Sequence, residues 1–325
     1  MGSELIEVIR PYWAPGLVAV PRITIEGFAA WVSMQRYQIH DRIETGKATL
    51  HFLDLQEPVE ALAYDLNRFA SAAFETIAGM TRTEALPRSG AWLCVQAYYG
   101  AYYAGHALVR ALGRTYSRLD SQEVNALNTI IDLFGMSNGT MLPTATYSGF
   151  VEPAVSSFAI SRVQDAQGGA SHAGFWRFFL NEIRTLRDRI LGGSGLTAQN
   201  QRAGVKLDEL CDALCRNGYN NGGWLSSVRN GINYRHQHGC WYPYDCRRQY
   251  ADRLYALIPK WKQDTYSFDL APNRPSDLVY FLTTCFFVIA ICRELVESIL
   301  ERRTVRHVFV EDGCLRVLSL VTNRS

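Results

Sequence analysis

Apolar side chains recur at steps of three and four residues over most of this chain, which is the spacing of one face of an α-helix. The first such stripe begins at Pro58 and ends at Gly79, a residue type that favours helix C-termini. A second stripe fills residues 90–112, and a third follows Ser121, a good N-cap residue, as far as Gly135. The same spacing predicts further helices over residues 175–191, 205–215 and 277–303.

Two long segments lack this helical spacing. Residues 1–54 are irregular, with short β-like pieces at 17–20 and 49–53. Residues 136–174 are rich in Ser, Thr, Gly and Pro and are predicted to form a loop. A loop of that length in a compact domain is usually a lid, an insertion or an unrecognised element.

The end of the chain has the pattern of a β-hairpin. Two apolar runs, at 305–310 and 315–321, flank a Glu-Asp-Gly turn. We therefore predict a mainly α fold, a helical bundle with a small mixed N-terminal segment and a C-terminal β-hairpin. The predicted divisions are residues 1–86, 87–304 and 305–325.

Composition places the chain among globular proteins. Its 325 residues are 48% hydrophobic and 20% charged, enough for a sizeable core and too apolar for disorder. The net charge of +2 gives no general attraction for nucleic acid or membrane, so any anion site must be local. The longest uncharged apolar run, 278–292, would span about 22 Å as a helix, short of a bilayer core, and is predicted to be a buried core helix.

Eight cysteines and no export signal complete that picture. The first ten residues carry two glutamates and no apolar segment. The cysteines lie mostly in helical, apolar surroundings, so we expect reduced thiols in a cytoplasmic protein with no membrane partner.

Signatures of several enzyme classes are missing from the sequence. There is no G-x-x-x-x-G-K-[ST], which excludes an ordinary P-loop nucleotide hydrolase, and no G-x-G-x-x-G after a strand. Residues 169–174 lack the G-x-S-x-G spacing of a hydrolase nucleophile, and no H-E-x-x-H is present.

Reactive side chains are densest at residues 227–240. This stretch holds two histidines, two arginines, three amides and a tyrosine. Arg247 and Arg248 follow, opposed only by Asp245 and Asp252. The sequence therefore predicts a local positive patch that can attract phosphates.

Within the stretch, Arg229 and His236 are seven residues apart, which is two turns of a helix, so both would project from one face. A guanidinium binds phosphate oxygens and stabilises charge in a transition state. An imidazole that titrates near neutrality can move a proton to or from a ribose oxygen. Asn230 could orient the arginine, and this chemistry requires no metal or other cofactor.

Arg229 and Asn230 followed by His236 resemble the R-x(4–6)-H motif of the HEPN superfamily, in which a polar residue typically follows the arginine. The predicted helix at 91–112, with its Ala-Tyr-Tyr-Gly-Ala-Tyr-Tyr-Ala run, is also similar to the small-plus-aromatic helix that opens many HEPN domains. The resemblance covers about residues 91–303.

The resemblance implies a homodimeric helical bundle that cuts RNA without metal. Two Arg/His motifs face each other, and the ribose 2′-hydroxyl attacks to leave a cyclic phosphate. Arg229 would stabilise the phosphate, Asn230 would support it, and His236 would be the acid and base. Many members are toxins or antiviral-defence effectors, so an antitoxin or another defence-system protein is an expected partner.

Other residues of the stretch have secondary roles in this interpretation. His238 could substitute for His236, and Arg235 and Tyr234 could support the site. Arg247, Arg248 and Trp241 would contact RNA.

Two alternative functions remain open from the sequence. A HEPN-like protein could bind RNA or a partner protein through this patch without cutting. Alternatively, a zinc ion could stabilise an interaction module. The zinc ligands would be His236, His238, Cys240 and Cys246, and a zinc-bound His236 could not be the catalytic base.

Structural roles are the remaining alternative for these side chains. Arg229 could form an interface or helix-end salt bridge, and the histidines could lie in a solvated loop. The tyrosines of 97–107 could pack in the core rather than stack on bases, and we expect His106 to be a hydrogen-bonded core residue. Trp224 and Trp241 could hold the motif in place.

Overall fold

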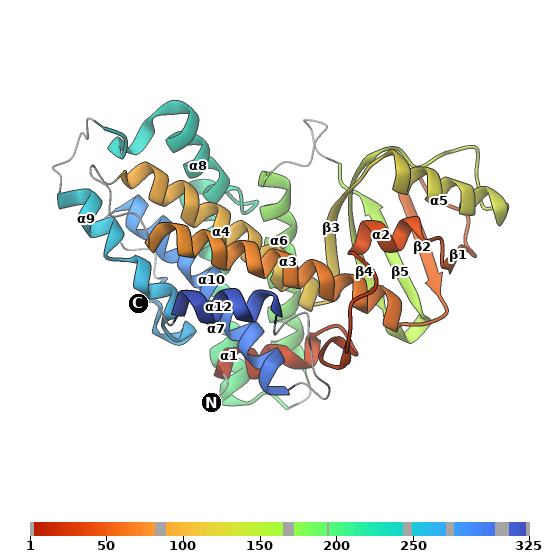
Figure 1. The fold of residues 1–325 in the computed structure, drawn as a ribbon, viewed down its shortest axis with the longest axis horizontal. Helices are drawn as coiled ribbons and strands as arrows, with labels where there is room; N and C mark the ends of the chain where they lie inside the picture. The colour runs from red at the N-terminus through yellow and green to blue at the C-terminus, as the bar shows by residue number, and fades with distance from the viewer. Residues whose placement is uncertain are drawn as a thin grey trace.

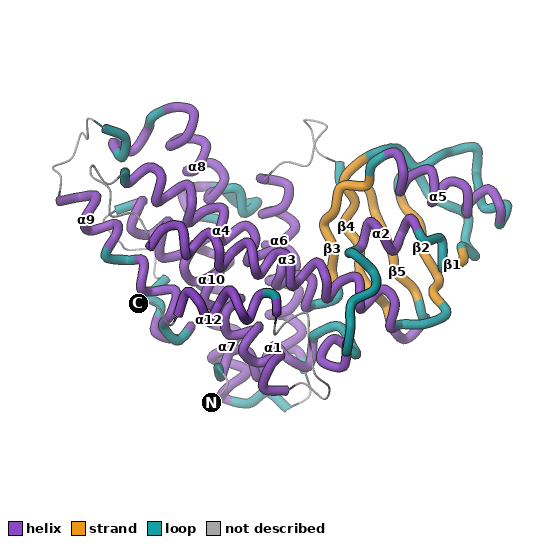
Figure 2. Tube along the Cα trace, viewed as in Figure 1, coloured by secondary structure: helices purple, strands orange, loops and turns teal. Residues whose placement is uncertain are grey.

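The computed structural model describes residues 3–81, 89–164, 172–193, 195–242, 249–270, 276–302 and 312–322. Within these residues the chain is mainly helical, with one five-stranded antiparallel sheet. Helices fill one side of the molecule and the sheet the other, with α6 (His172–Gly192) between them (Figures 1 and 2). The predicted divisions at residues 86 and 304 fall outside the described residues.

Three long helices form the centre of the helical part. α10 (Asp277–Arg302) packs along α4 (Gly90–Ala111), which packs along α3 (Gln56–Thr81). Small residues allow the close approach: a Cβ on Gly100 of α4 would lie 3.1 Å from Ile289 Cδ1 of α10. Around these three lie α1 (Glu4–Ile9), α6, α7 (Ala198–Leu214), α8 (Trp224–Arg235), α9 (Gln249–Tyr255) and α12 (Cys314–Thr322).

The sheet has its own hydrophobic core. Its strand order is β1-β2-β5-β4-β3, and every neighbouring pair is antiparallel. The strands are β1 (Tyr37–Gln38), β2 (Lys47–Phe52), β3 (Arg114–Leu119), β4 (Ala145–Glu152) and β5 (Ser157–Arg162). α2 (Phe28–Ser33) and α5 (Ser121–Leu133) cover one face, where Phe28 lies 4.8 Å from Phe158 between ring centroids.

A buried ion pair joins the two parts. Asp65 of α3 accepts a hydrogen bond from Arg110 Nε of α4 at 3.3 Å, and Arg110 is 1% exposed. The same guanidinium donates to Ser117 Oγ of β3 at 2.9 Å. Arg110 therefore links α4 to α3 and to β3, the edge strand of the sheet.

The predicted helical stripes are confirmed by α3, α4, α5, α6, α7 and α10. Within the described residues one helix, α10, is long and apolar enough to cross a membrane, and 89% of its most apolar window is buried inside the fold. The helix that we expected to begin at Ser121 has Asp120 as its N-cap, in a capping box with Glu123.

The predicted C-terminal hairpin is wrong in its second half. Residues 314–322 form α12, because Cys314, Leu318 and Val321 recur at helical spacing and are buried against α3. The first half, 305–310, lies outside the described residues.

The predicted loop at 136–174 is also wrong, since it contains β4 and β5. β3 was not predicted, and the β-like piece at 17–20 is the 3-10 helix Leu17–Ala19. Other 3-10 helices are Arg10–Tyr12, Pro153–Val155, Arg216–Gly218, Gln237–Gly239, Ile258–Lys262 and Thr265–Ser267.

Candidate functional site

The motif that resembles the HEPN signature lies on α8, which packs across α4 and α6. Arg229 is on the buried side of this helix and is 4% exposed. α8 ends at Arg235, and His236 follows it in a left-handed conformation with φ 50°. His236 is therefore not on the helix, and the expected alignment of Arg229 and His236 along two helical turns does not form.

The two side chains have different aromatic neighbours. The Arg229 guanidinium lies 5.0 Å from the ring centroid of Tyr98 and 5.7 Å from that of Tyr99. The His236 ring instead lies 5.6 Å from Trp241, whose ring lies 5.7 Å from Trp92. Among the described contacts, none joins Arg229 to His236.

Aromatic rings, rather than a carboxylate, surround the Arg229 cation. Its Nη1 lies 3.5 Å from the hydroxyl of Tyr234, a long hydrogen bond. Among the described residues its buried Nε has no hydrogen-bond partner, and no ion pair involves it. Cation–π contact offsets part of the cost of removing the charge from water. Among the residues that the structure describes, the guanidinium therefore lies just beneath the surface with no carboxylate partner.

His172, at the start of α6, is a neighbour of Arg229 that the sequence interpretation missed. Its ring lies 5.6 Å from Tyr99 and 4.5 Å from Tyr102. Burial and the Arg229 charge lower its pKa to about 4, and its buried Nδ1 has no hydrogen-bond partner among the described residues. The imidazole is therefore neutral at pH 7 and can accept or donate one hydrogen bond.

Aromatic side chains extend from this point over the surface of the helical part. Trp92, Tyr99 and Tyr103 lie on one stripe of α4 and are partly or well exposed, with Trp92 at 54%. Tyr234 of α8 is 69% exposed. We define the aromatic face as Trp92, Tyr99, Tyr102, Tyr103, Tyr234 and Trp241.

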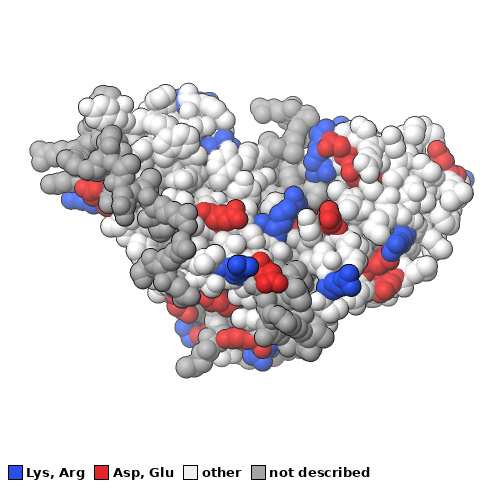
Figure 3. All heavy atoms as spheres, viewed as in Figure 1, with Lys and Arg blue, Asp and Glu red and all other residues white. Residues whose placement is uncertain are grey.

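Carboxylates are missing from the elements that carry the aromatic face. α4, α8 and residues 172–181 of α6 contain no Asp or Glu, whereas Arg229 and Arg235 are on α8. In Figure 3 the visible surface over α8 shows Lys or Arg and no Asp or Glu. These elements thus contribute arginines and no carboxylates, although the chain as a whole is nearly neutral.

The remaining predicted residues have separate positions. Asn230 is exposed and points away from the buried side of α8, since successive residues on a helix are turned by about 100°. Arg235 and His238 are exposed. Trp241 Nε1 donates to the Ile232 carbonyl at 2.7 Å, so Trp241 holds the end of the motif in place.

Three predicted residues, Arg247, Arg248 and Cys246, lie outside the described residues. In the part of the chain that the structure describes, no three His, Cys, Asp or Glu side chains gather as they would around a metal. His236, His238 and Cys240 therefore do not form three ligands of one site. Cys240 is 1% exposed, and its Sγ faces the Gln237 carbonyl at 3.7 Å.

His106 is in the core, as expected. Its ring stacks between Phe69 at 4.6 Å and Phe175 at 3.8 Å. Its buried Nδ1 has no hydrogen-bond partner among the described residues.

Comparison of the chain with protein-family models, with curated proteins and with solved structures finds no match. The interpretation of the aromatic face therefore depends on its own geometry and charge.

Proposed function

We propose that this protein binds single-stranded RNA on the aromatic face. The observation that carries the proposal is a set of partly exposed aromatic rings, most of them on α4 and α8, two helices that contain arginine and no carboxylate. Bases of a single strand stack on such rings, and the phosphates between them are attracted by the arginines. The preference for RNA comes from the resemblance of Arg229 and His236 to the HEPN motif.

Metal-independent cleavage at the same face is the second candidate, and one observation favours it. His236 is exposed, so a ribose could approach its imidazole. Arg229 is in contact with Tyr234, which is itself 69% exposed and joined to it by a hydrogen bond of 3.5 Å. Rotation of Tyr234 on RNA binding would open Arg229 to a phosphate. If the protein cleaves RNA, the HEPN resemblance implies that it does so as a homodimer.

RNA binding is tested by fluorescence anisotropy with a labelled single-stranded RNA of about a dozen nucleotides. Domains that bind single strands cover about 4–16 nucleotides each. Tyr99→Ala and Tyr234→Ala should each weaken binding by about five- to hundredfold, because stacking of one base contributes about 1–3 kcal/mol. Phe134→Ala, at the exposed aromatic residue that caps the C-terminus of α5, is the matched control and should leave binding unchanged. Equal affinity of all four proteins would refute the proposal.

Cleavage is tested on the same RNA in EDTA. His236→Ala should abolish cutting if the second candidate is correct, whereas His40→Ala, an exposed histidine near the sheet, should not. A substrate with 2′-deoxyribose at the cut position should stay intact. Binding without any cutting by the unaltered protein leaves RNA binding alone as the function.

A further inference from the structure

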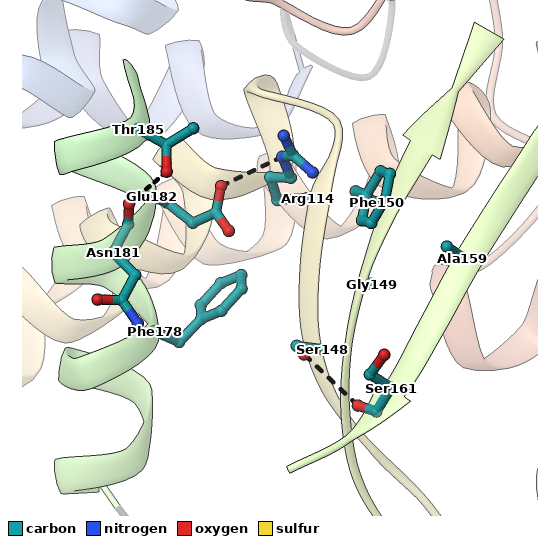
Figure 4. A pocket seen from close by; sticks show the side chains of 10 residues that line it. All are labelled: Arg114, Ser148, Gly149, Phe150, Ala159, Ser161, Phe178, Asn181, Glu182 and Thr185. Atoms are coloured by element: carbon teal, nitrogen blue, oxygen red, sulfur yellow. Dashed lines mark hydrogen bonds and ion pairs between the residues drawn. The ribbon is translucent and has the colours of Figure 1, made fainter. Parts of the chain in front are cut away.

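A second candidate site lies away from the aromatic face, between α6 and the sheet. Here a cavity of about 340 Å³ is open to one side (Figure 4). α6 contributes one wall, with Phe178, Asn181 and Glu182, and β3, β4 and β5 contribute the other. The cavity lies on the face of the sheet opposite α2 and α5, and its volume is within the usual range of small-molecule sites.

Strand alternation explains why this space is not filled. On β5 the large side chains Phe158 and Ile160 point into the core under α2 and α5, so Ala159 and Ser161 face the cavity. On β4 the same alternation places Ser148 on the cavity side. Small side chains therefore form part of the wall opposite α6, beside Arg114 and Phe150.

One ion pair supplies the charges of the cavity. Arg114 Nε lies 3.2 Å from Glu182 Oε2, and the two side chains are 22% and 18% exposed. Burial raises the pKa of Glu182, and Arg114 lowers it. The Arg114 guanidinium also stacks 4.6 Å from the Phe150 ring centroid, which fixes its position. Because the two charges cancel, the cavity does not favour a phosphate or another strongly charged ligand.

Donors, acceptors and a flat wall are nevertheless all present. Phe178 packs on Tyr116 at 5.4 Å and lines the cavity, so it offers an aromatic surface. The Asn181 amide lies on the same wall and carries both a donor and an acceptor. Glu182 has a second carboxylate oxygen, besides the one facing Arg114, that can accept hydrogen bonds from hydroxyl groups.

We propose that this cavity binds a nucleoside. A carboxylate is the group that proteins commonly place on ribose hydroxyls, and an aromatic ring is a platform for a base. Glu182, oriented by Arg114, accepts from the ribose diol, the base lies against Phe178, and Asn181 reads its edge. The proposal is independent of RNA binding, because no residue of the aromatic face lines the cavity.

The test is isothermal titration calorimetry of the full chain with adenosine, guanosine, cytidine and uridine. At least one should bind saturably at concentrations up to about 5 mM, the range of weak specific sites. Removal of the diol, as in the 2′,3′-dideoxy form of the nucleoside that binds, should weaken affinity at least about tenfold. Free ribose and the free base should each bind more weakly than the nucleoside.

Variants locate the binding. Ser161→Trp fills the cavity and should abolish binding. Gln38→Trp, which is on β1 but on the same face of the sheet as Ser161, should not. Glu182→Gln and Phe178→Leu should each weaken binding about tenfold, and they carry the test if the tryptophan variant does not fold. No saturable heat with any nucleoside, equal affinity for the dideoxy form or for ribose, or full affinity in Ser161→Trp would overturn the proposal.

Discussion

Two buried arginines in this molecule have opposite surroundings. At the junction between the helices and the sheet, Arg110 is 1% exposed and is bound by Asp65, by Ser117 and by the Tyr116 carbonyl. Under the aromatic face, Arg229 is 4% exposed and is surrounded by tyrosine rings, with no ion pair among the described residues.

The difference distinguishes a charge that stabilises the fold from a charge that can attract a ligand. A buried cation with a carboxylate partner stabilises one arrangement of the chain, and its field is largely cancelled outside. A buried cation without one costs folding free energy and leaves a positive potential at the nearest surface. We therefore expect loss of Arg110 to affect stability and loss of Arg229 to affect binding.

The largest effect is expected from Arg110→Met, which leaves buried Asp65 with the exposed Arg68 as its cationic partner among the described residues. Breaking a buried pair from one side costs about 3–5 kcal/mol. Urea unfolding should show that loss in the free energy of unfolding. Arg68→Ala is the control, since Arg68 is 60% exposed and should change stability by less than about 1 kcal/mol. Equal free energies of unfolding for Arg110→Met and the unaltered protein would show that Arg110 does not stabilise the fold.

Arg229→Met should give the reverse result. An apolar side chain of similar length replaces a cation without a carboxylate partner, so the free energy of unfolding should stay within about 1 kcal/mol or rise. RNA affinity, measured by anisotropy, should fall about tenfold because the charge beneath the tyrosines is gone. A variant that unfolds while its affinity per folded molecule is unchanged would show that Arg229 is structural as well.

Acid should destabilise the folded protein through His172, the neighbour of Arg229. The pKa of His172 is about 4 in the folded protein, against 6.5 for an unperturbed histidine, so the unfolded chain binds the proton more readily between these values. The contribution of neutral His172 to the free energy of unfolding is complete above pH 6.5 and is lost as the pH falls towards 4. The Tm should therefore fall less between pH 7 and 4 in His172→Asn than in the unaltered protein. His40→Asn, at an exposed site, should follow the unaltered protein, and identical curves for all three would contradict this sign.

The smallest effect concerns the exposed arginine of α8. Arg235→Ala should reduce the slope of log affinity against log salt by about 1, the contribution of one phosphate contact, with only a modest loss of affinity. Arg22→Ala, at an exposed site before α2, should leave the slope unchanged. A change of slope in both variants would show that the attraction is a property of the whole surface rather than of the aromatic face.

The long helices could be predicted from the sequence because each carries its own apolar stripe. Those of α3, α4 and α10 reflect burial against one another, and local spacing records that burial. The segment 314–322 shows the limit of this signal, since a run of nine residues contains both alternating and helical spacing, and contact with α3 decides between them.

The candidate site was predictable only in part. Arg229 and the tyrosines of α4 could be named from the sequence, but the end of α8 at Arg235 could not, because His236 adopts a left-handed conformation that local spacing does not record. His172 could not be found either, since it meets Tyr99 and Arg229 through contacts between residues far apart in the chain. Tertiary packing, rather than local propensity, selects which histidine lies beside the buried arginine.

Photo-crosslinking is the most direct test of RNA binding on the aromatic face. A single-stranded RNA containing 4-thiouridine is irradiated with the full chain, and cross-linked peptides are mapped by mass spectrometry. We predict cross-links within residues 92–103 and 224–242, with a loss of signal in Tyr99→Ala and Tyr234→Ala. Cross-links confined to the sheet, or unchanged in both variants, would contradict the account.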